Sequence, residues 1–199
     1  MRRRTMALWG KNTSDESKPK NLTTAQKQEV YANNLGWVQE AGTVASGNGN
    51  ANATPEVLVA IGGLATSLGQ ATIDAVSFDV GQTISGAGGS SIKVFVHFNE
   101  QVTIAGGSPL MYVSNNQAGS GGASSITLTM DGGAGTRDSL QFSGTASNAN
   151  VNANDVISVA AQTINLNGAT IVDAVGGGNA VRTISAAVAS AAGTITVGS

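Results

Sequence analysis

Short runs of alternating apolar and polar residues fill positions 73–184, and they constrain the fold more than any other feature of the chain. In the run Ile92–Asn99 every second side chain is apolar; Lys93, His97 and Asn99 point the other way, and only Phe95 interrupts that polar face. Side chains of a strand alternate between two faces, so this run predicts a half-buried strand. Several such strands at near-regular spacing predict an all-β protein built as a small β-sandwich. His97 is then expected to be an ordinary surface histidine on the outer face.

The other runs predict a series of strands separated by well-marked turns. The expected strands are residues 73–78, 91–98, 110–113, 125–130, 139–142, 155–159 and 163–166, with weaker ones at 170–172 and 181–184. The dipeptides Asp131-Gly132 and Asn167-Gly168 suit the positive φ angles of tight turns. A further strand is expected at 56–61, ahead of the sandwich, and residues 194–197 could add an edge strand to this chain or to another.

The composition suits a structural protein better than an enzyme. Charged residues make up 11% of the 199 positions and aromatic residues 4%, while glycine contributes 27, which favours a thin-cored β protein that covers its surface with neighbours. The chain has no cysteine, which excludes thiol catalysis, cysteine-ligated zinc and disulfides. No apolar run approaches the roughly 20 residues that span a bilayer, so no membrane partner is expected. The basic start lacks a following apolar stretch, so we expect no secretory leader, and Met6 offers a second start besides Met1.

Charge is distributed unevenly along the chain. Residues 1–40 hold seven Lys/Arg and four Asp/Glu, a net +3, whereas residues 41–199 hold three and eight, a net −5. A basic tail on an acidic body favours contact with a neighbouring molecule, although a solvated tail is the plainer alternative. The candidate partner-binding residues are Arg2, Arg3, Arg4, Leu8, Trp9 and Trp37. Trp9 would be an aromatic anchor, or would fold back onto its own sandwich; three arginines are too small a patch to predict nucleic-acid binding.

One short helix is expected near the N-terminus. Thr23 and Gln26 form a capping-box pattern, good helix formers continue to Ala32, and Asn33, Asn34 and Gly36 would end the helix. The expected organisation is therefore an extended N-terminal arm with one short helix (1–40), a linker and strand (41–72), the sandwich (73–185) and a C-terminal tail or edge strand (186–199).

Catalytic and cofactor motifs are not found. His97 is the single histidine, no G-x-S-x-G elbow accompanies it, and no glycine-rich segment ends in the Lys-Ser/Thr of a phosphate loop. We therefore expect neither an enzyme nor a cofactor. Calcium is the most plausible metal, with Asp131, Asp138, Asp155 and Asp173 as candidates. Because no D-x-D-x-D-G loop is present, we expect these aspartates to stabilise turns instead of holding a metal.

Two motifs carry a resemblance to a known family. Val80–Ile84 followed by Ile92–Ile104 resembles the opening of bacterial Ig-like surface repeats, in which a strand precedes F-[ST]-E-x-V; here Asn99 replaces the usual Ser or Thr. Gly107–Leu110 matches the G-x-P-x-L that follows, and Leu166–Gly176 resembles the L-N-G-[GA]-T-I-x-D-x-x-G ending. This resemblance covers about residues 73–185 and implies an Ig-like Greek-key sandwich, without implying a ligand.

The N-terminus has a resemblance of its own. Met6–Gly10 looks like the start of structural proteins of marine tailed phages, chiefly T4-like cyanophages, in which a GWV and an LVA pattern follow; Gly36–Val38 and Leu58–Ala60 stand in that order here. The resemblance implies a virion structural protein, in the first place a capsid decoration or cement protein whose partners are the major capsid protein and other copies of itself. The alternatives are a tail, baseplate or fibre component, or a cell-surface adhesion module that binds host glycans.

Overall fold

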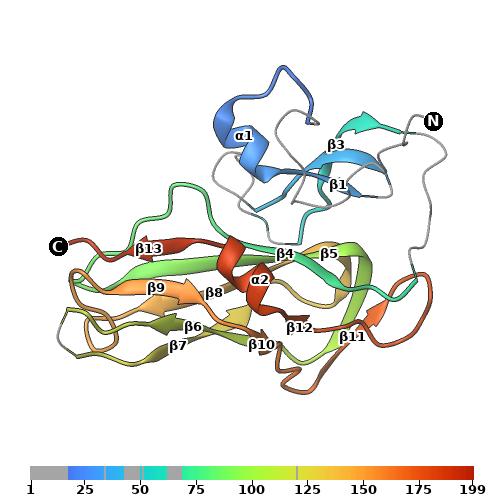
Figure 1. The fold of residues 1–199 in the computed structure, drawn as a ribbon. Helices are drawn as coiled ribbons and strands as arrows, with labels where there is room; N and C mark the ends of the chain where they lie inside the picture. The colour runs from blue at the N-terminus through green and yellow to red at the C-terminus, as the bar shows by residue number, and fades with distance from the viewer. Residues whose placement is uncertain (1–17, 34, 43–49, 51, 62–68, 120) are drawn as a thin grey trace.

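The protein is an all-β sandwich that carries a small additional sheet at its N-terminal end. The computed structural model describes residues 18–33, 35–42, 50, 52–61, 69–119 and 121–199 (Figure 1). Strands hold 50% of the residues and helices 7%, and the sheets are antiparallel, which confirms the predicted fold class.

The main sheet has eight strands. They are β4 (Ile73–Phe78), β5 (Ser90–Gly106), β6 (Leu110–Asn115), β7 (Ser125–Met130), β8 (Gly135–Ala146), β9 (Val156–Val159), β11 (Ala169–Asp173) and β13 (Thr194–Thr196). They pair in the order β11-β5-β8-β7-β6-β9-β13, and β4 pairs with the first half of β5. Strand β5 lies beside β8 and not beside its sequence neighbour β6, which is a Greek-key arrangement.

The sheet rolls up until its two ends almost meet. Gly86 N–H donates to Gly198 O at 2.8 Å, and Gly198 N–H donates to Ile84 O at 2.8 Å, so the segment after β13 joins the loop before β5. Helix α2 (Ala186–Ala191) lies against β4 near this junction (Figure 1). The short strands β10 (Gln162–Thr163) and β12 (Thr183–Ile184) form a separate two-stranded pair.

The predicted strands agree well with those observed, and two differences have clear causes. Strands β5 and β8 run on past their predicted ends because β5 exchanges β4 for β11 as its partner halfway along, and its register with β8 shifts between His97 and Val102. Strand β13 confirms the expected edge strand, but α2 is a second helix where only one was expected. It forms because Ser185 caps it by accepting from Val188 N–H and because Ala189 is buried.

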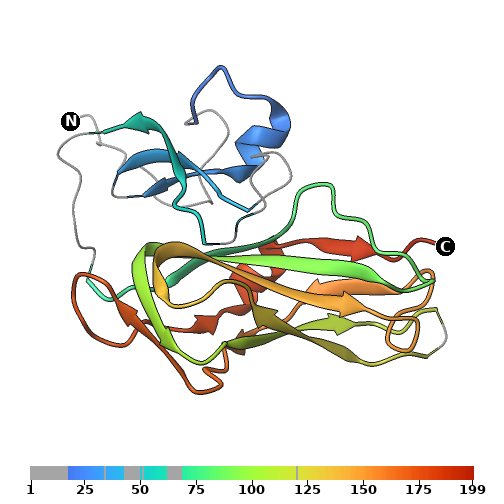
Figure 2. The ribbon, with the colours of Figure 1, turned by 180° about the vertical axis from the view of Figure 1, so that it is seen from behind.

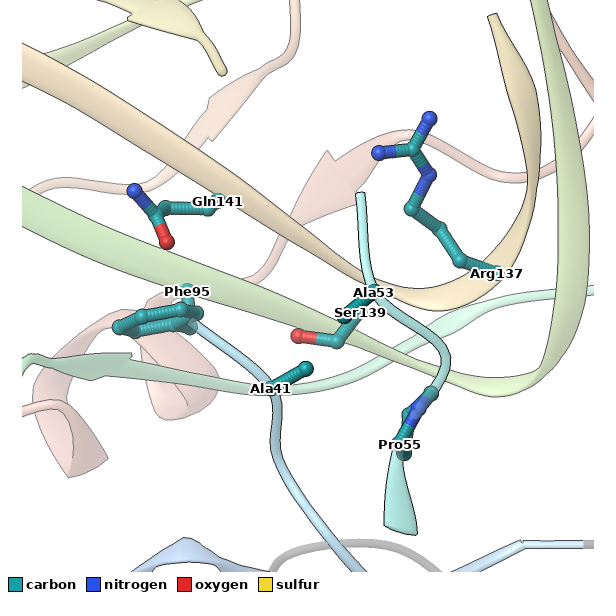
Figure 3. A pocket seen from close by; sticks show the side chains of 7 residues that line it. All are labelled: Ala41, Ala53, Pro55, Phe95, Arg137, Ser139 and Gln141. Carbon is teal, nitrogen blue, oxygen red and sulfur yellow. The ribbon is translucent and has the colours of Figure 1, made fainter. Parts of the chain in front are cut away.

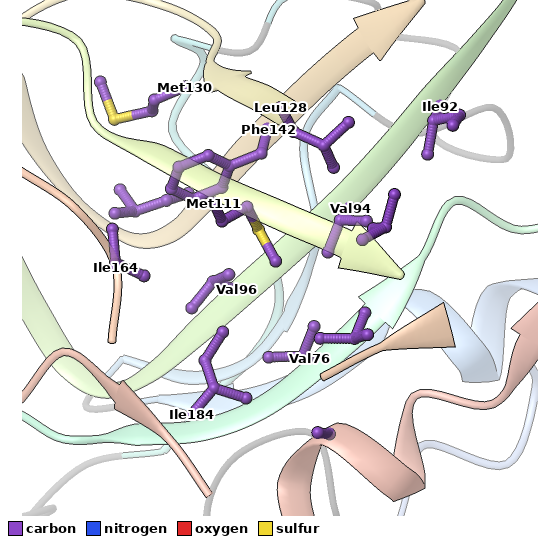
Figure 4. Packing of buried hydrophobic residues seen from close by; sticks show 14 of the residues in the cluster. Val76, Ile92, Val94, Val96, Met111, Leu128, Met130, Phe142, Ile164 and Ile184 are labelled. Carbon is purple, nitrogen blue, oxygen red and sulfur yellow. The ribbon is translucent and has the colours of Figure 1, made fainter. Parts of the chain in front are cut away.

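Apolar side chains on the inner face of the rolled sheet meet between its opposite walls and form one core (Figure 4). In β7 the side chains of Ile126, Leu128 and Met130 are buried while Thr127 and Thr129 are exposed, as the alternation predicts. The aromatic rings of this core are those of Phe98 and Phe142, both buried.

The N-terminal part folds into helix α1 (Thr24–Glu29) and a three-stranded sheet of β1 (Val30–Asn33), β2 (Gly36–Gln39) and β3 (Glu56–Ala60), here called the N-terminal sheet. The capping box of Thr23 and Gln26 is confirmed. The prediction that the helix continues to Ala32 is wrong, because β-forming Val30 and Tyr31 turn the chain into a strand whose side chains are buried. Residues 18–33 and 35–40 of the expected arm are therefore folded, and residues 1–17 and 34 lie outside the described residues.

Candidate interaction surfaces

The N-terminal sheet lies over the outer face of β5 and β8, as Figures 1 and 2 show from opposite sides. The contact, here called the polar interface, is built on hydrogen bonds between buried groups. Tyr31 OH donates to Asp138 Oδ1 at 2.6 Å, and Asn33 Nδ2 donates to Asp138 Oδ2 at 2.7 Å. Burial, together with the charge of Asp138, raises the pKa of Tyr31 well above its ordinary value, so the phenol stays a donor.

A second group of contacts joins Glu40, just after β2, to the sandwich. His97 Nε2 lies 2.9 Å from Glu40 Oε1, and Ser139 Oγ donates to the same oxygen at 2.8 Å. The imidazole ring also lies against Tyr31, with 5.2 Å between the ring centroids. Through these contacts Glu40 links the N-terminal sheet to both β5 and β8 of the sandwich.

The prediction that His97 is a surface histidine is wrong: its exposed fraction is 0%. The outer face of β5 is covered by the N-terminal sheet, which a strand's own alternation cannot reveal. One signal was present in the sequence. Phe95, the apolar residue that interrupts the polar face, is 2% exposed and indicates that another element covers this face.

The polar interface continues around a small cavity of about 10 Å³, lined on one side by Ala41, Ala53 and Pro55 and on the other by side chains of β5 and β8 (Figure 3). A cavity of this size has room for one water molecule, which would offer a donor to the buried Gln141 Oε1. Beside it, Arg137 Nη1 donates to Asn52 Oδ1 at 3.0 Å, and burial lowers the pKa of this guanidinium.

The hydrophobic core of the sandwich does not include the N-terminal sheet. Every residue of the core cluster lies between Ala71 and Val197, although Val30, Tyr31 and Val38 of the N-terminal sheet are also fully buried. The sandwich thus has a complete core of its own, and the N-terminal sheet is attached through hydrogen bonds and charged groups.

Exposed apolar side chains gather on this attached sheet. Leu35, Val57, Val59 and Ile61, here called the apolar edge, are 42–43% exposed. Within the described residues β3 pairs only with β2, so its other edge has no neighbouring strand there. Edge strands of soluble proteins usually carry charges or proline against association; β3 has Pro55 and the exposed Glu56 at its start but is apolar from Val57 to Ile61. The sequence predicts a strand here and places Leu58–Ala60 in the pattern shared with phage structural proteins, but it does not predict an exposed edge.

Of the predicted partner-binding residues, the structure places one at this surface. Trp37 on β2 lies directly opposite Val59 on β3 and is half-buried. Arg2, Arg3, Arg4, Leu8 and Trp9 lie outside the described residues.

The four aspartates considered for calcium all accept hydrogen bonds from the protein. Asp155 accepts from Asn115 Nδ2 and from two backbone amides, and Asp173 accepts from three backbone amides. Burial opposes ionisation of both, but these hydrogen bonds lower the pKa of each carboxyl. Asp131 accepts from Gln141 and Ser143. Among the described residues, no three acidic, histidine or cysteine side chains are grouped closely enough to hold a metal ion.

No family model, no curated protein and no solved structure matches the chain. Within the part of the chain described here, no helix has the length and apolar character needed to cross a membrane.

Proposed function

We propose that the protein is a virion structural protein, a capsid decoration or cement protein that binds the assembled head through its N-terminal part. The observation that carries the proposal is the apolar edge, which lies on a sheet outside the sandwich core. An exposed apolar strand edge is a ready site for strand addition by a partner chain. The attached sheet would serve as the binding element and the sandwich as the outer body.

Charge and sequence motifs support the same arrangement. Residues 1–40 carry a net +3 and the remaining residues a net −5, so the N-terminal part would approach an acidic surface first. The resemblance of Met6–Gly10 to tailed-phage structural proteins points to a virion. In this proposal Arg2–Arg4 contact acidic capsid residues, Leu8 and Trp9 fill apolar pockets, and Trp37 lies beside Val59 on the same face of the N-terminal sheet and extends its apolar surface.

The mechanism would be stabilisation through selective binding. A protein that binds the assembled shell and not the free subunit lowers the free energy of the shell by mass action. Contacts between neighbouring copies would add avidity, because each bound molecule places a second binding site at high effective concentration beside the next position on the shell.

The test mixes purified full-length protein with undecorated phage heads and measures co-sedimentation, with cryo-electron microscopy of the pelleted heads. The variant is Val59→Lys, which places a charge on the apolar edge; the matched control is Val175→Lys, because Val175 is 55% exposed on the sandwich. We expect saturable binding of the wild type and the control and at least a tenfold loss for Val59→Lys, since an unpaired lysine in an apolar contact costs about 1.4 kcal/mol or more.

Equal binding of Val59→Lys and wild type would refute the role of the apolar edge. No binding of the wild type to heads would refute the decoration role, and the same sedimentation with purified tails would then test a tail, baseplate or fibre role.

A further inference from the structure

A groove of about 430 Å³ opens where the rolled sheet fails to close. Its walls are the end of β4, the turn that follows, and the junction between α2 and β13, with Gln28 of α1 at its rim. Clefts of 300–1,000 Å³ are typical of small-molecule sites, and edges of sheets that do not pair leave such clefts. The groove lies apart from the apolar edge of β3, since the two share no lining residue.

The lining combines apolar and hydrogen-bonding side chains. Phe78, Val80 and Ile195 are the larger apolar residues, and Ser77, Asp79, Gln82 and Thr194 bring hydroxyl, carboxylate and amide groups. Among the residues that the structure describes, no lysine, arginine or histidine lines the groove, so these residues offer an anionic ligand no cation. This composition suits a neutral ligand that is apolar on one side and carries hydroxyl groups around its rim.

Two polar atoms in the wall have no hydrogen-bond partner among the described residues. Gln82 Oε1 accepts from Lys93 N–H at 2.5 Å, which fixes the amide, while Gln82 Nε2 is buried without an acceptor. Ser77 Oγ is likewise buried without a hydrogen bond in the protein. Buried polar groups in folded proteins nearly always have partners, so two such atoms in the wall of one groove point to a missing ligand or water.

We propose that this groove binds a neutral sugar unit, either a free monosaccharide or the end of a glycan chain. A pyranose ring has apolar C–H faces, which would lie on Phe78 and Ile195, and hydroxyl groups that both donate and accept. In the bound state the hydroxyl groups of the ring reach Ser77 Oγ and Gln82 Nε2, which gives both atoms partners. The proposal does not depend on binding to phage heads.

The test is an NMR titration of the ¹⁵N-labelled full-length protein with glucose, galactose, mannose, N-acetylglucosamine and their methyl glycosides, each up to about 50 mM, because a ligand this small is expected to bind with a Kd near 1–10 mM. Methylamine is titrated in parallel to test the groove for a cationic ligand. We expect saturable shifts of the amides of residues 80–82 and 192–195 with at least one sugar. A methyl glycoside that binds as well as the free sugar would identify the end of a glycan chain as a ligand.

Two tryptophan variants on one strand separate groove binding from nonspecific effects. Thr194 and Thr196 are both exposed and lie on the same face of β13, but only Thr194 lines the groove. Thr194→Trp should weaken sugar binding at least tenfold, and Thr196→Trp should leave it within twofold. Saturation by none of the sugars, equal binding by both variants, or shifts with methylamine alone would overturn the proposal.

Discussion

The hydrogen bond between Tyr31 and Asp138 gives the sharpest test of how the N-terminal sheet is attached. Replacing Tyr31 with Phe removes only the hydroxyl group and leaves the buried ring in place. Asp138 then keeps Asn33 Nδ2 but loses the 2.6 Å hydrogen bond from the phenol. A hydrogen bond to a charged group contributes about 1.5–3 kcal/mol, so the free energy of docking should fall by that amount.

The loss should be local. Because the core cluster contains no residue of the N-terminal sheet, the sandwich should stay folded when the sheet detaches. A small three-stranded sheet is marginally stable without a surface to cover, so detachment should also open its own hydrogen bonds. We expect amide hydrogen exchange in residues 30–39 to accelerate about 10- to 150-fold, the equivalent of 1.5–3 kcal/mol, with little change in β6 and β7.

The second tyrosine of the chain supplies the control. Tyr112 is 42% exposed on β6, so Tyr112→Phe makes the same chemical change outside the polar interface and should leave exchange in residues 30–39 unchanged. Unchanged exchange in Tyr31→Phe would refute the role of this hydrogen bond. Equal acceleration across the sandwich would show that the N-terminal sheet and the sandwich unfold as one cooperative unit.

Three further predictions concern stability. Because the pKa of Tyr31 is raised on folding, its contribution to stability is fully present below about pH 10, where the unfolded phenol begins to ionise, and is lost as pH rises further. Urea unfolding at pH 9 and pH 11 should show the free energy of unfolding of the wild type falling by up to about 1.4 kcal/mol per pH unit more than that of Tyr31→Phe. The lowered pKa of Asp155 has the opposite sign: Asp155→Asn should lower the free energy of unfolding at pH 7 by about 1–3 kcal/mol. The gap to wild type should shrink as pH falls below about 4, because the carboxyl takes up a proton first in the unfolded chain and only at lower pH in the folded protein; a gap independent of pH would contradict this. Glu40→Ala leaves His97 and Ser139 buried without the carboxylate that they share, so it should weaken docking of the N-terminal sheet by about 3 kcal/mol. Limited proteolysis should then remove the N-terminal sheet faster and leave the sandwich intact; an unchanged cleavage rate would contradict the prediction.

Much of the sandwich could be predicted from the sequence because a half-buried strand alternates apolar and polar residues between its two faces. Strands β4 and β7 begin and end at the predicted residues, and the turns at Asp131 and Asn167 fall where predicted. The capping box at Thr23 was equally readable, because capping depends on residues three positions apart. These features are local, so neighbouring residues are sufficient to predict them.

The candidate surfaces could be read only in part. Trp37 was recognised, but the apolar edge was not distinguished from any other strand, since the sequence does not show which strand ends a sheet. The pairing of Glu40 with His97 joins residues 57 positions apart, and that of Tyr31 with Asp138 joins residues 107 positions apart. In both pairs, the residues around one partner in the sequence do not indicate the other partner.

By itself, the sequence determined the strands, the turns and the all-β class, because alternation and turn chemistry act between near neighbours along the chain. The tertiary structure alone decided that the outer face of β5 is covered, that His97 is buried, and that a groove remains between β4 and β13. These outcomes depend on which distant segments come to lie against each other. Burial is a property of that arrangement and not of the residue, which is why the same alternating pattern can describe a face in water and a face beneath another sheet.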